Sequence, residues 1–443
     1  MLRPGVGWQH PTPCFTFAME RFVLPDAVLD AITADHWATR PGVWRAPSAV
    51  PYATPDALLA ALRGLFAQLD GGDTIVVPRV YADARPVGFR LDAHLPAEGE
   101  SFAAWEDRLR EWARGRELGM VVQEAQSLGG PLWSSALSVA RAIYRRRGMT
   151  PGGAHSEIFL GNYRRSFFHV HKDSLETLTF VVRGRKRFLV WPYEVFADRP
   201  EVFEGGEGAQ INLDPDLDYG PYRDKAIVLE GGPGDVLFWP ASYWHVAEGV
   251  DDAFVTTVTV AFFPSSTRSA GCPFRLANEA IVRFAADGFV SEDPSYPAPV
   301  DAQGVAGVVD GLDATLHRLL EDPTVRRARR EFALMWTTAM GFRRVPEEGA
   351  APDLEPAHVI EIDPENPLRW VDVDEDAFPT SVNGLVVTAT RAYLPLVEHL
   401  NRGGRFVVGA LLDTFARDSL SEQDVLDALG ALGAVRYFRV IEG

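Results

Sequence analysis

The chain has 443 residues, of which 47% are hydrophobic and 23% are charged, and its formal net charge is −18. This length predicts two or three domains with sizeable cores, and the negative charge counts against a nucleic-acid-binding protein while favouring a basic peptide or protein partner. No apolar run reaches the ~18 residues that a membrane-spanning helix needs, and two cysteines, Cys14 and Cys272, are too few for a disulfide framework or a cysteine-rich zinc site.

The first 150 residues mix helices with occasional strands. Apolar residues at helical spacing predict helices over residues 55–66, 101–116 and 132–147. Runs rich in β-branched residues predict short strands over residues 74–78 and 120–123. The opening residues, MLRPGVGWQHPTPCF, lack the layout of a signal peptide, so we expect a cytoplasmic protein.

From about His155 the pattern changes to one short strand after another. Gly, Pro and Asp separate these runs, which cover residues 155–160, 178–182, 187–191, 226–229, 235–239 and 254–263. Many short strands with regular turn signals predict a closed barrel or sandwich.

Helical character returns from Phe274 to about Phe342, and a Pro- and acid-rich stretch over residues 345–352 is typical of a linker. The last ninety or so residues combine strands with helices, one of which begins at Ser421 with a capping-box pattern. This order favours a winged helix. We therefore expect a first domain over residues 1–265, with an extension over 1–150 and a barrel core over 151–265. A helical region over 266–345 and a winged-helix-like domain over 353–443 follow.

Two segments carry residues that could hold a metal. His171 and Asp173 are two apart on an extended chain, so their side chains point to the same side. The segment from Gly234 to His245 supplies a third ligand, His245, after a Gly-Asp turn, an apolar strand and a Pro corner. Two imidazoles and one carboxylate on one face of an ion leave three coordination positions open, as in non-haem Fe(II) oxygenases.

Together with the strand that begins Gly184-Arg185-Lys186, these segments resemble the JmjC family of Fe(II)- and 2-oxoglutarate-dependent oxygenases. The resemblance covers roughly residues 155–265 and includes H-x-D, G-x-K and G-D-x-L-F-x-P-x-x-x-x-H. It implies an α+β fold built on a double-stranded β-helix of the JmjC and cupin type with flanking helices. It also implies Fe(II) as the metal, held by His171, Asp173 and His245, with 2-oxoglutarate and O2 as co-substrates.

In that family the lysine of G-x-K pairs with the distal carboxylate of 2-oxoglutarate, and Lys186 occupies this position. Strand alternation supports an inward orientation, because Lys186 shares a face with Phe188 and Val190. Several hydroxyl groups could assist it. The candidates on strand faces are Thr177, Thr179, Thr257 and Thr259, and Tyr163 and Ser166 are further candidates.

Two other interpretations stay open. His169, His171, Glu176 and His245 nearly fit the metal motif of classical cupins, which work without 2-oxoglutarate, but this scheme leaves Asp173 and Lys186 without roles. Alternatively, the barrel is a non-catalytic module that binds a peptide.

The predicted architecture also resembles the bacterial ribosomal oxygenases, in which the helical part mediates dimerisation and the winged helix engages a protein substrate. It implies hydroxylation of an amino-acid side chain in a ribosomal protein. Winged-helix units also recognise leader peptides in enzymes that modify ribosomally made natural products, so a peptide or protein hydroxylase covers both kinds of substrate. A homodimer formed through residues 266–345 is a further expectation.

Overall fold

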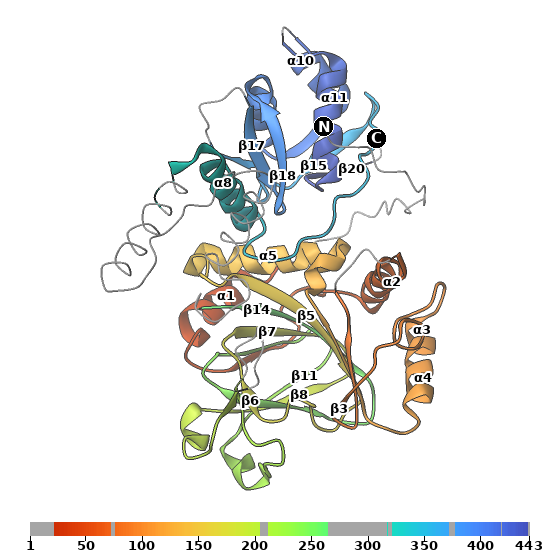
Figure 1. Cartoon of the computed structure of the whole chain (residues 1–443), viewed down its shortest axis with the longest axis vertical. Helices are drawn as coiled ribbons and strands as arrows, with labels where there is room; N and C mark the ends of the chain where they lie inside the picture. The colour runs from red at the N-terminus through yellow and green to blue at the C-terminus, as the bar shows by residue number, and fades with distance from the viewer. Residues whose placement is uncertain are drawn as a thin grey trace, which may run out of the picture.

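The computed structural model describes residues 22–71, 76–203, 211–264, 317, 321–371, 377–417 and 419–441. Two antiparallel sheets face each other and form a double-stranded β-helix, and a smaller unit follows it in the chain (Figure 1). This confirms the α+β class and the barrel predicted from the sequence. None of the described helices is both long and apolar enough to cross a membrane.

The larger sheet of the barrel has eight strands and the smaller sheet has six. In spatial order the larger sheet consists of β1 (Gly42–Trp44), β12 (Val236–Trp239), β7 (Glu176–Arg183), β14 (Val255–Phe262), β5 (Ala154–Gly161), β4 (Leu118–Gln123), β2 (Arg79–Ala82) and β3 (Arg85–Val87). The smaller sheet consists of β11 (Ile227–Gly231), β8 (Lys186–Trp191), β13 (Trp244–Gly249), β6 (His171–Lys172), β10 (Ile211–Asn212) and β9 (Val202–Phe203). Most of these neighbours are far apart in the chain, so the sheets fix where distant side chains meet.

The tight turn that passes the chain from β7 to β8 requires a glycine. Gly184 has φ 74, and a Cβ atom there would lie 2.7 Å from the carbonyl oxygen of Phe254. A larger residue would be strained in this conformation and would also collide with the backbone. The turn directs β8 back along the smaller sheet, with Lys186 at its start.

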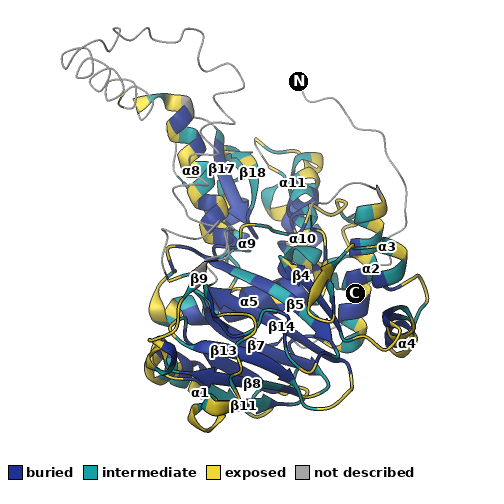
Figure 2. Cartoon of the chain, turned by 60° about the horizontal axis from the view of Figure 1, so that its bottom comes forward, coloured by how far each residue is buried: buried dark blue, intermediate teal, exposed yellow. Residues whose placement is uncertain are grey.

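Helices cover the outer face of the larger sheet and bury its apolar side chains (Figure 2). They are α1 (Asp26–Asp30), the π-helical turn η1 (Ala31–His36), α2 (Pro55–Gly71), α3 (Leu91–His94), α4 (Phe102–Ala113), the 3-10 turn η2 (Ala125–Leu128) and α5 (Gly130–Arg147). The core between these helices and the sheet includes Leu62 and Ile143 from the helices and Ile158, Val258 and Val260 from the strands, all fully buried. A separate cluster, containing Val181, Phe188 and Val190, fills the inside of the barrel. Residues on one face of each strand therefore point toward the helices and those on the other point into the barrel.

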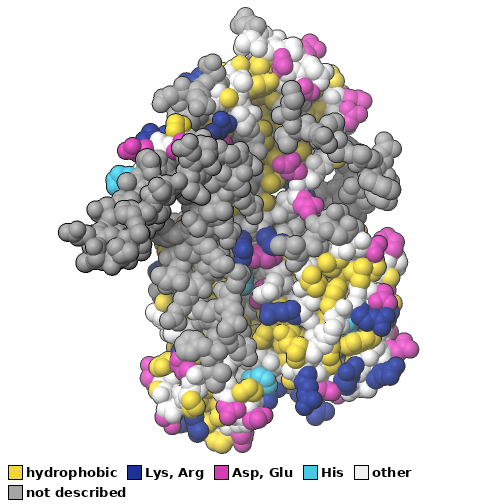
Figure 3. Space-filling model, viewed as in Figure 1, with side chains coloured by type: hydrophobic (Ala, Val, Ile, Leu, Met, Phe, Trp, Pro, Cys, Tyr) yellow, Lys and Arg dark blue, Asp and Glu magenta, His cyan; other side chains and the backbone are white. Residues whose placement is uncertain are grey.

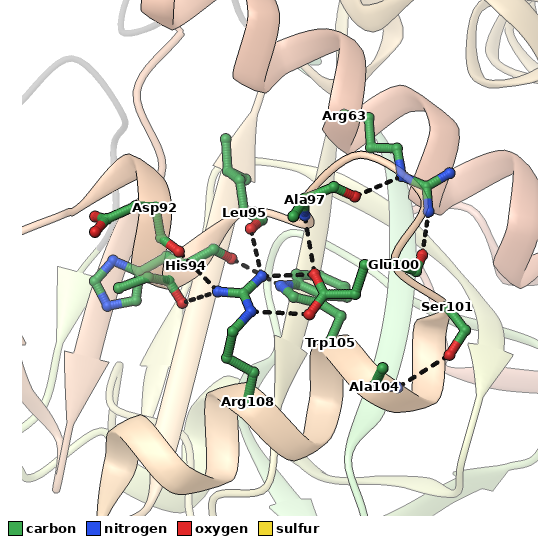
Figure 4. Close-up of polar contacts among 11 residues, drawn as sticks. Arg63, Asp92, His94, Leu95, Ala97, Glu100, Ser101, Ala104, Trp105 and Arg108 are labelled. Carbon is green, nitrogen blue, oxygen red and sulfur yellow. Dashed lines mark hydrogen bonds and ion pairs between the residues drawn. The ribbon is translucent and has the colours of Figure 1, made fainter.

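Arg108 of α4 organises the segment between α3 and α4 (Figure 4). Its guanidinium donates to both carboxylate oxygens of Glu100, at 2.9 and 2.7 Å, and to the carbonyl oxygens of Asp92, Ala93 and Leu95. The planar guanidinium can satisfy acceptors on two sides at once, which a lysine could not do. This network fixes α4 to α3 and to the segment between them.

Sequence patterning located most elements of the barrel domain. The predicted helices correspond to α2, α4 and α5, and the strand over 120–123 and those from 155 onward correspond to β4, β5, β7, β8, β11, β12 and β14. The strand predicted over residues 74–78 is wrong in its described part, because residues 76–78 are not in a strand and β2 begins at Arg79. Pro78 has no N–H to donate to a ladder, which explains why pairing starts after it.

The second unit has its own core. Its elements are α8 (Pro323–Thr338), β15 (Val359–Ile362), β16 (Arg369–Trp370), β17 (Ala377–Val382), β18 (Leu385–Thr390), α9 (Leu394–Leu400), β19 (Gly404–Val407), α10 (Val408–Phe415), α11 (Glu422–Ala434) and β20 (Phe438–Ile441). The capping box is present at the start of α11, where Ser421 and Asp424 bond each other's backbone N–H groups. The order from α9 to β20 is helix, strand, two helices and strand, and β15 completes the sheet between β19 and β20.

The winged-helix assignment of residues 353–443 stays a prediction, as do the domain boundaries. Most of the helical region over 266–345 lies outside the described residues, and so do Cys14 and Cys272. Its role in dimerisation is therefore also still a prediction. On the face shown in Figure 3, basic and acidic side chains are interspersed, and apolar side chains gather in its lower right part.

Helix α5 lies between the barrel and the second unit (Figure 1). Arg141 of α5 is 6% exposed; it contacts the amide oxygen of Asn366 and lies 3.6 Å from a carboxylate oxygen of Asp363. One turn further on, the more exposed Arg145 pairs with Glu365 at 2.7 Å. The same helix thus packs on the barrel and binds the loop after β15.

We predict that Arg141→Ala destabilises the protein by about 2 kcal/mol, because it removes a buried cation together with its hydrogen bond to half-buried polar partners. Arg145→Ala serves as the matched control, since an exposed ion pair contributes at most about 1 kcal/mol. Thermal and urea unfolding of both variants measure the difference. Equal losses in the two variants would show that Arg141 does not connect the two units.

Candidate metal centre

A tight turn over residues 166–169 leads the chain into β6. The Ser166 N–H donates to the carbonyl oxygen of Ala247 on β13 at 2.8 Å, and the His169 N–H donates to the Ser166 carbonyl oxygen at 3.1 Å. His169 itself has φ 58, in the left-handed region that non-glycine residues seldom occupy. Such strained residues concentrate at functional sites. The result is that β6 pairs with β13 with His171 directly opposite His245.

Three side chains meet at this pair of strands. The Oδ2 atom of Asp173 lies 3.7 Å from Nε2 of His171 and 3.5 Å from Nε2 of His245. The two imidazole rings are 4.2 Å apart between centroids, and all three ligand atoms lie within 4.8 Å of one another. Within the described part of the chain, this is the one group of three or more such side chains that could hold a metal ion.

Backbone carbonyls hold both imidazoles in the orientation that a metal needs. Nδ1 of His171 lies 3.1 Å from the His169 carbonyl oxygen, and Nδ1 of His245 lies 3.3 Å from the Tyr243 carbonyl oxygen. A carbonyl can only accept, so each Nδ1 carries the proton and each Nε2 presents a lone pair toward Asp173.

The protonation states also suit a metal. Burial, together with the neighbouring His245, lowers the pKa of His171 to about 4. Burial alone would raise the pKa of Asp173, but His171 and His245 outweigh it and lower that pKa to about 2. At neutral pH the site therefore offers a neutral His171 imidazole and a carboxylate, which are the forms that bind metal ions.

Lys186 lies deeper in the barrel. Lys186 begins β8, and Val190, four residues later on the same strand, pairs with His245. About 13 Å of strand therefore separates Lys186 from the position beside His245. The Lys186 ammonium is 3% exposed, donates to the Tyr163 hydroxyl and lies 4.2 Å from the centre of the Tyr163 ring. Burial lowers its pKa to about 7, and among the described residues no carboxylate pairs with it. A buried cation of this kind is completed by an anion.

The predicted threonines line the same interior. Thr177 and Thr179 lie on the inner face of β7, the face that Val181 presents to the barrel core, and their buried hydroxyls have no partner among the described residues. Thr257 and Thr259 of β14 pair in register with Val181 and Thr179 and so face the same space. The Thr177 and Thr179 hydroxyls are therefore free to bind a molecule inside the barrel.

The cupin alternative receives no support from the geometry. Glu176 precedes Thr177 on β7, so its side chain points away from the barrel interior. On the outer face, its carboxylate accepts a hydrogen bond from the Ala38 N–H at 3.2 Å. Burial raises its pKa to about 7. His169 lies on the turn with its Nδ1 3.3 Å from Nη2 of Arg165. Neither residue belongs to the group that could hold a metal.

Of the two further hydroxyl candidates, Tyr163 lies beside Lys186 and Ser166 does not. Ser166 supports the turn, because its hydroxyl accepts from the Phe168 N–H at 3.2 Å. Tyr163 contacts Lys186, as described above. Two tryptophans near His245 are packing residues. The Trp239 ring is 4.9 Å from the His245 ring, and Trp244 is buried on the outer face of the smaller sheet.

Polar residues on the inner face of β5 and β4 were not among the candidates from the sequence. His155 and Glu157 lie there with Phe159, and Glu157 accepts from the side-chain amide of Gln123 at 3.1 Å. Alternation already placed the three β5 residues on one face. It could not tell which face of the strand points into the barrel.

The donor set fits Fe(II), because two imidazole nitrogens and one carboxylate on one side are the ligands of non-haem iron oxygenases. The buried Lys186 and the unpartnered threonine hydroxyls fit a dicarboxylate beside that metal. These residues would hold the metal at the end of the barrel near β6 and an anionic co-substrate further inside.

Comparison with known proteins agrees with this architecture. Residues 131–267 match the sequence model of the family described as the cupin-like domain. Solved structures of Escherichia coli YcfD are similar over 95% of this chain. One covers 100% of the YcfD chain at 16% identity with a TM-score of 0.51. Another structure, of YcfD described as a ribosomal oxygenase, covers 99% of that chain at 15% identity with a TM-score of 0.50.

Curated relatives match over a shorter stretch. HSPB1-associated protein 1 of Mus musculus is 32% identical over 112 residues, which is 24% of this chain and 23% of the relative. Its counterpart in Rattus norvegicus is 35% identical over 94 residues, 19% of this chain and 20% of the relative. The chain thus matches less than a quarter of the length of these relatives. Its residues 131–267 match the cupin-like domain family, and its fold is shared with YcfD.

We predict that Asp173→Ala weakens Mn(II) binding, measured by calorimetry, by more than about a hundredfold. This exceeds the ten- to hundredfold loss that follows from removing only a hydrogen-bond partner of a ligand. The matched control is Glu176→Gln, which removes a carboxylate that faces away from the site and leaves binding unchanged. Metal retained by Asp173→Ala but lost by Glu176→Gln would favour the cupin scheme.

Proposed function

We propose that this protein is an Fe(II)- and 2-oxoglutarate-dependent dioxygenase that hydroxylates an amino-acid side chain in a peptide or protein. The observation that carries the proposal is the His171, Asp173 and His245 group, whose ligand atoms lie within 4.8 Å of one another at one end of the barrel. When bound, Fe(II) with 2-oxoglutarate and O2 supplies oxidative decarboxylation to succinate and CO2, coupled to insertion of one oxygen into a C–H bond.

The residues of the chain have distinct parts in this reaction. The triad would hold the metal and would leave coordination positions for the co-substrates. Lys186, with the Tyr163 hydroxyl beside it, would bind the distal carboxylate of 2-oxoglutarate, and the Thr177 and Thr179 hydroxyls would donate to the same molecule. The apolar barrel core, including Phe188 and Val190, excludes water from this end of the pocket.

A peptide or protein substrate is supported by three observations. YcfD, which shares the fold, is called a ribosomal oxygenase. The barrel is followed by a second unit with its own core, which offers further surface to a large substrate. The net charge of −18 attracts basic chains. The proposed substrates are therefore ribosomal proteins or ribosomally made precursors. The proposed location is the cytoplasm, as expected from the sequence.

The deciding experiment incubates the full chain with Fe(II), 2-oxoglutarate, O2 and basic peptides drawn from ribosomal proteins and from precursors encoded nearby in the genome. Mass spectrometry should detect a gain of one oxygen in a peptide, with one succinate formed per hydroxylation. Anaerobic addition of 2-oxoglutarate to the Fe(II) protein should also give a visible metal-to-ligand charge-transfer band. Absence of that band would refute the oxygenase and leave a peptide-binding module.

Variants make the assignment of residues specific. His171→Ala should abolish both the band and the product. Lys186→Met should weaken 2-oxoglutarate binding about tenfold or more, since a hydrogen bond between charged groups contributes about 1.5–3 kcal/mol. The matched control is Lys225→Met, which removes an exposed lysine. This variant should keep the wild-type affinity for 2-oxoglutarate, the charge-transfer band and the product. A 2-oxoglutarate affinity unaffected by Lys186→Met would place the co-substrate elsewhere.

The lowered pKa of Lys186 predicts a pH dependence of co-substrate binding. Burial brings this pKa to about 7, so the ammonium form that pairs with a carboxylate is lost as pH rises through 7. The dissociation constant of 2-oxoglutarate should therefore increase about tenfold per pH unit above 7. Calorimetry in Mn(II)-loaded protein between about pH 6 and 8 measures this together with the accompanying proton uptake. Lys186→Met should flatten the profile; a wild-type affinity that is constant or rises with pH would contradict the prediction.

A further inference from the structure

Lys172, the residue between two of the metal ligands, is held on the outside of the barrel. It follows His171 and precedes Asp173, so its side chain points away from the metal centre while theirs point toward it. The strand β6 consists of His171 and Lys172 alone, and it lies between β13 and β10 in the smaller sheet. A strand this short makes few ladder hydrogen bonds, so the ladder alone restrains it weakly.

Two aromatic rings receive the ammonium group of Lys172. Its Nζ atom lies 4.1 Å from the centre of the Tyr193 ring and 4.7 Å from the centre of the Trp244 ring. The two rings are nearly parallel, with 15° between their planes and 6.3 Å between their centroids. Both distances from Nζ are within the ~6 Å over which a ring attracts a cation. Tyr193 begins the 3-10 turn η3 (Tyr193–Phe196) after β8, and Trp244 begins β13.

A carboxylate completes the surroundings of this ammonium group. Nζ of Lys172 donates to Oε1 of Glu201 at 2.7 Å, and the Tyr193 hydroxyl donates to the same oxygen at 3.2 Å. The hydrogen bond from Lys172 is the main cause that lowers the pKa of Glu201, so this carboxyl is ionised at neutral pH. The Lys172 side chain is 15% exposed, which distinguishes it from a freely moving surface lysine. We call Lys172, Tyr193, Trp244 and Glu201 the lysine cluster.

The lysine cluster connects the strands that carry the metal ligands. His171 lies opposite His245, and the next position of this antiparallel ladder places Lys172 opposite Trp244. Trp244 is fully buried and pairs in register with Trp191 of β8, so it is itself fixed in the smaller sheet. A shift of β6 along β13 would therefore have to break the contacts of the ammonium group on the outer face as well as the ladder.

We propose that Lys172 is a positioning residue of the metal centre: the lysine cluster fixes β6 against β13 from the outer face, so that the ligands on either side of Lys172 meet His245 at the correct distance. This inference rests on the metal site of the proposed function, but it concerns how the ligands are held and not which reaction follows. Lys172 touches neither the metal nor a substrate. It acts through the backbone that it shares with His171 and Asp173.

A direct electrostatic effect of Lys172 would have the opposite sign. A positive charge near a divalent cation repels it, so replacing Lys172 by a neutral residue would strengthen metal binding if charge alone mattered. Loss of positioning weakens metal binding, as does the removal of other groups that orient ligands. The direction of the change in affinity therefore distinguishes the two effects.

The test compares the full wild-type chain with Lys172→Met and Lys172→Arg. Calorimetry measures the affinity for Mn(II), and the visible absorption spectrum of protein saturated with Co(II) reports the geometry of the ligands. Lys172→Met keeps an unbranched side chain and loses the charge, so it should weaken Mn(II) binding about tenfold and change the Co(II) spectrum. Lys172→Arg should restore both toward wild type, because a guanidinium also packs on aromatic rings and pairs with a carboxylate.

Two further variants make the test specific. Glu201→Gln should also weaken Mn(II) binding, and combining it with Lys172→Met should cost little more than Lys172→Met alone, because both changes remove the same contact. Lys225→Met is the matched control. It removes a lysine that also lies near an aromatic ring, 5.8 Å from the centre of Tyr222, at the end of the 3-10 turn η4 (Gly220–Lys225), and it should change neither the affinity nor the spectrum.

Mn(II) binding that is unchanged or stronger in Lys172→Met would overturn the inference. A weakening with an unaltered Co(II) spectrum, or one that Lys172→Arg does not reduce, would also overturn it, since the residue would then contribute to folding alone. Metal binding that depends on Lys172 as expected, in a protein that fails to bind 2-oxoglutarate, would refute the oxygenase and leave the inference standing.

Discussion

The pairing of β6 with β13 is the interaction on which the site depends. It places His171 opposite His245, and Asp173, two residues further along, reaches both imidazoles. The β6 strand has only two residues, so its position comes from the turn before it and from the neighbouring β10. Closure of the barrel thus converts two segments separated by more than seventy residues into one metal-binding face.

Local signals in the sequence were sufficient for most of the barrel and for the ligands. These signals are local because a short segment determines its own backbone geometry. They are the H-x-D spacing, the turn at Gly184 and the apolar strand before His245. The strands β6 and β13 were not predicted, because β6 is too short to show a period and β13 mixes the ligand with small and acidic residues. Their pairing exists only in the closed barrel.

The environment of each side chain was harder to predict than its position. Alternation put Lys186 on the face of Phe188, yet the sequence could not show that Tyr163, twenty-three residues earlier, would be its partner. Glu176 looked like a ligand by spacing and lies on the outer face of its strand. Glu157 gave no signal, because its hydrogen-bond partner Gln123 comes from another strand of the sheet.

The bond between the Ser166 N–H and the Ala247 carbonyl has a mechanical consequence. It ties the turn that leads to His171 onto the same strand that carries His245. Thermal motion of β13 would therefore move the two imidazoles together. Asp173 lies on the segment that leads away from β6, and this hydrogen bond does not restrain it. The distance between the two nitrogens should then be the stiffest dimension of the site, and adjustment to different ions should occur through the carboxylate.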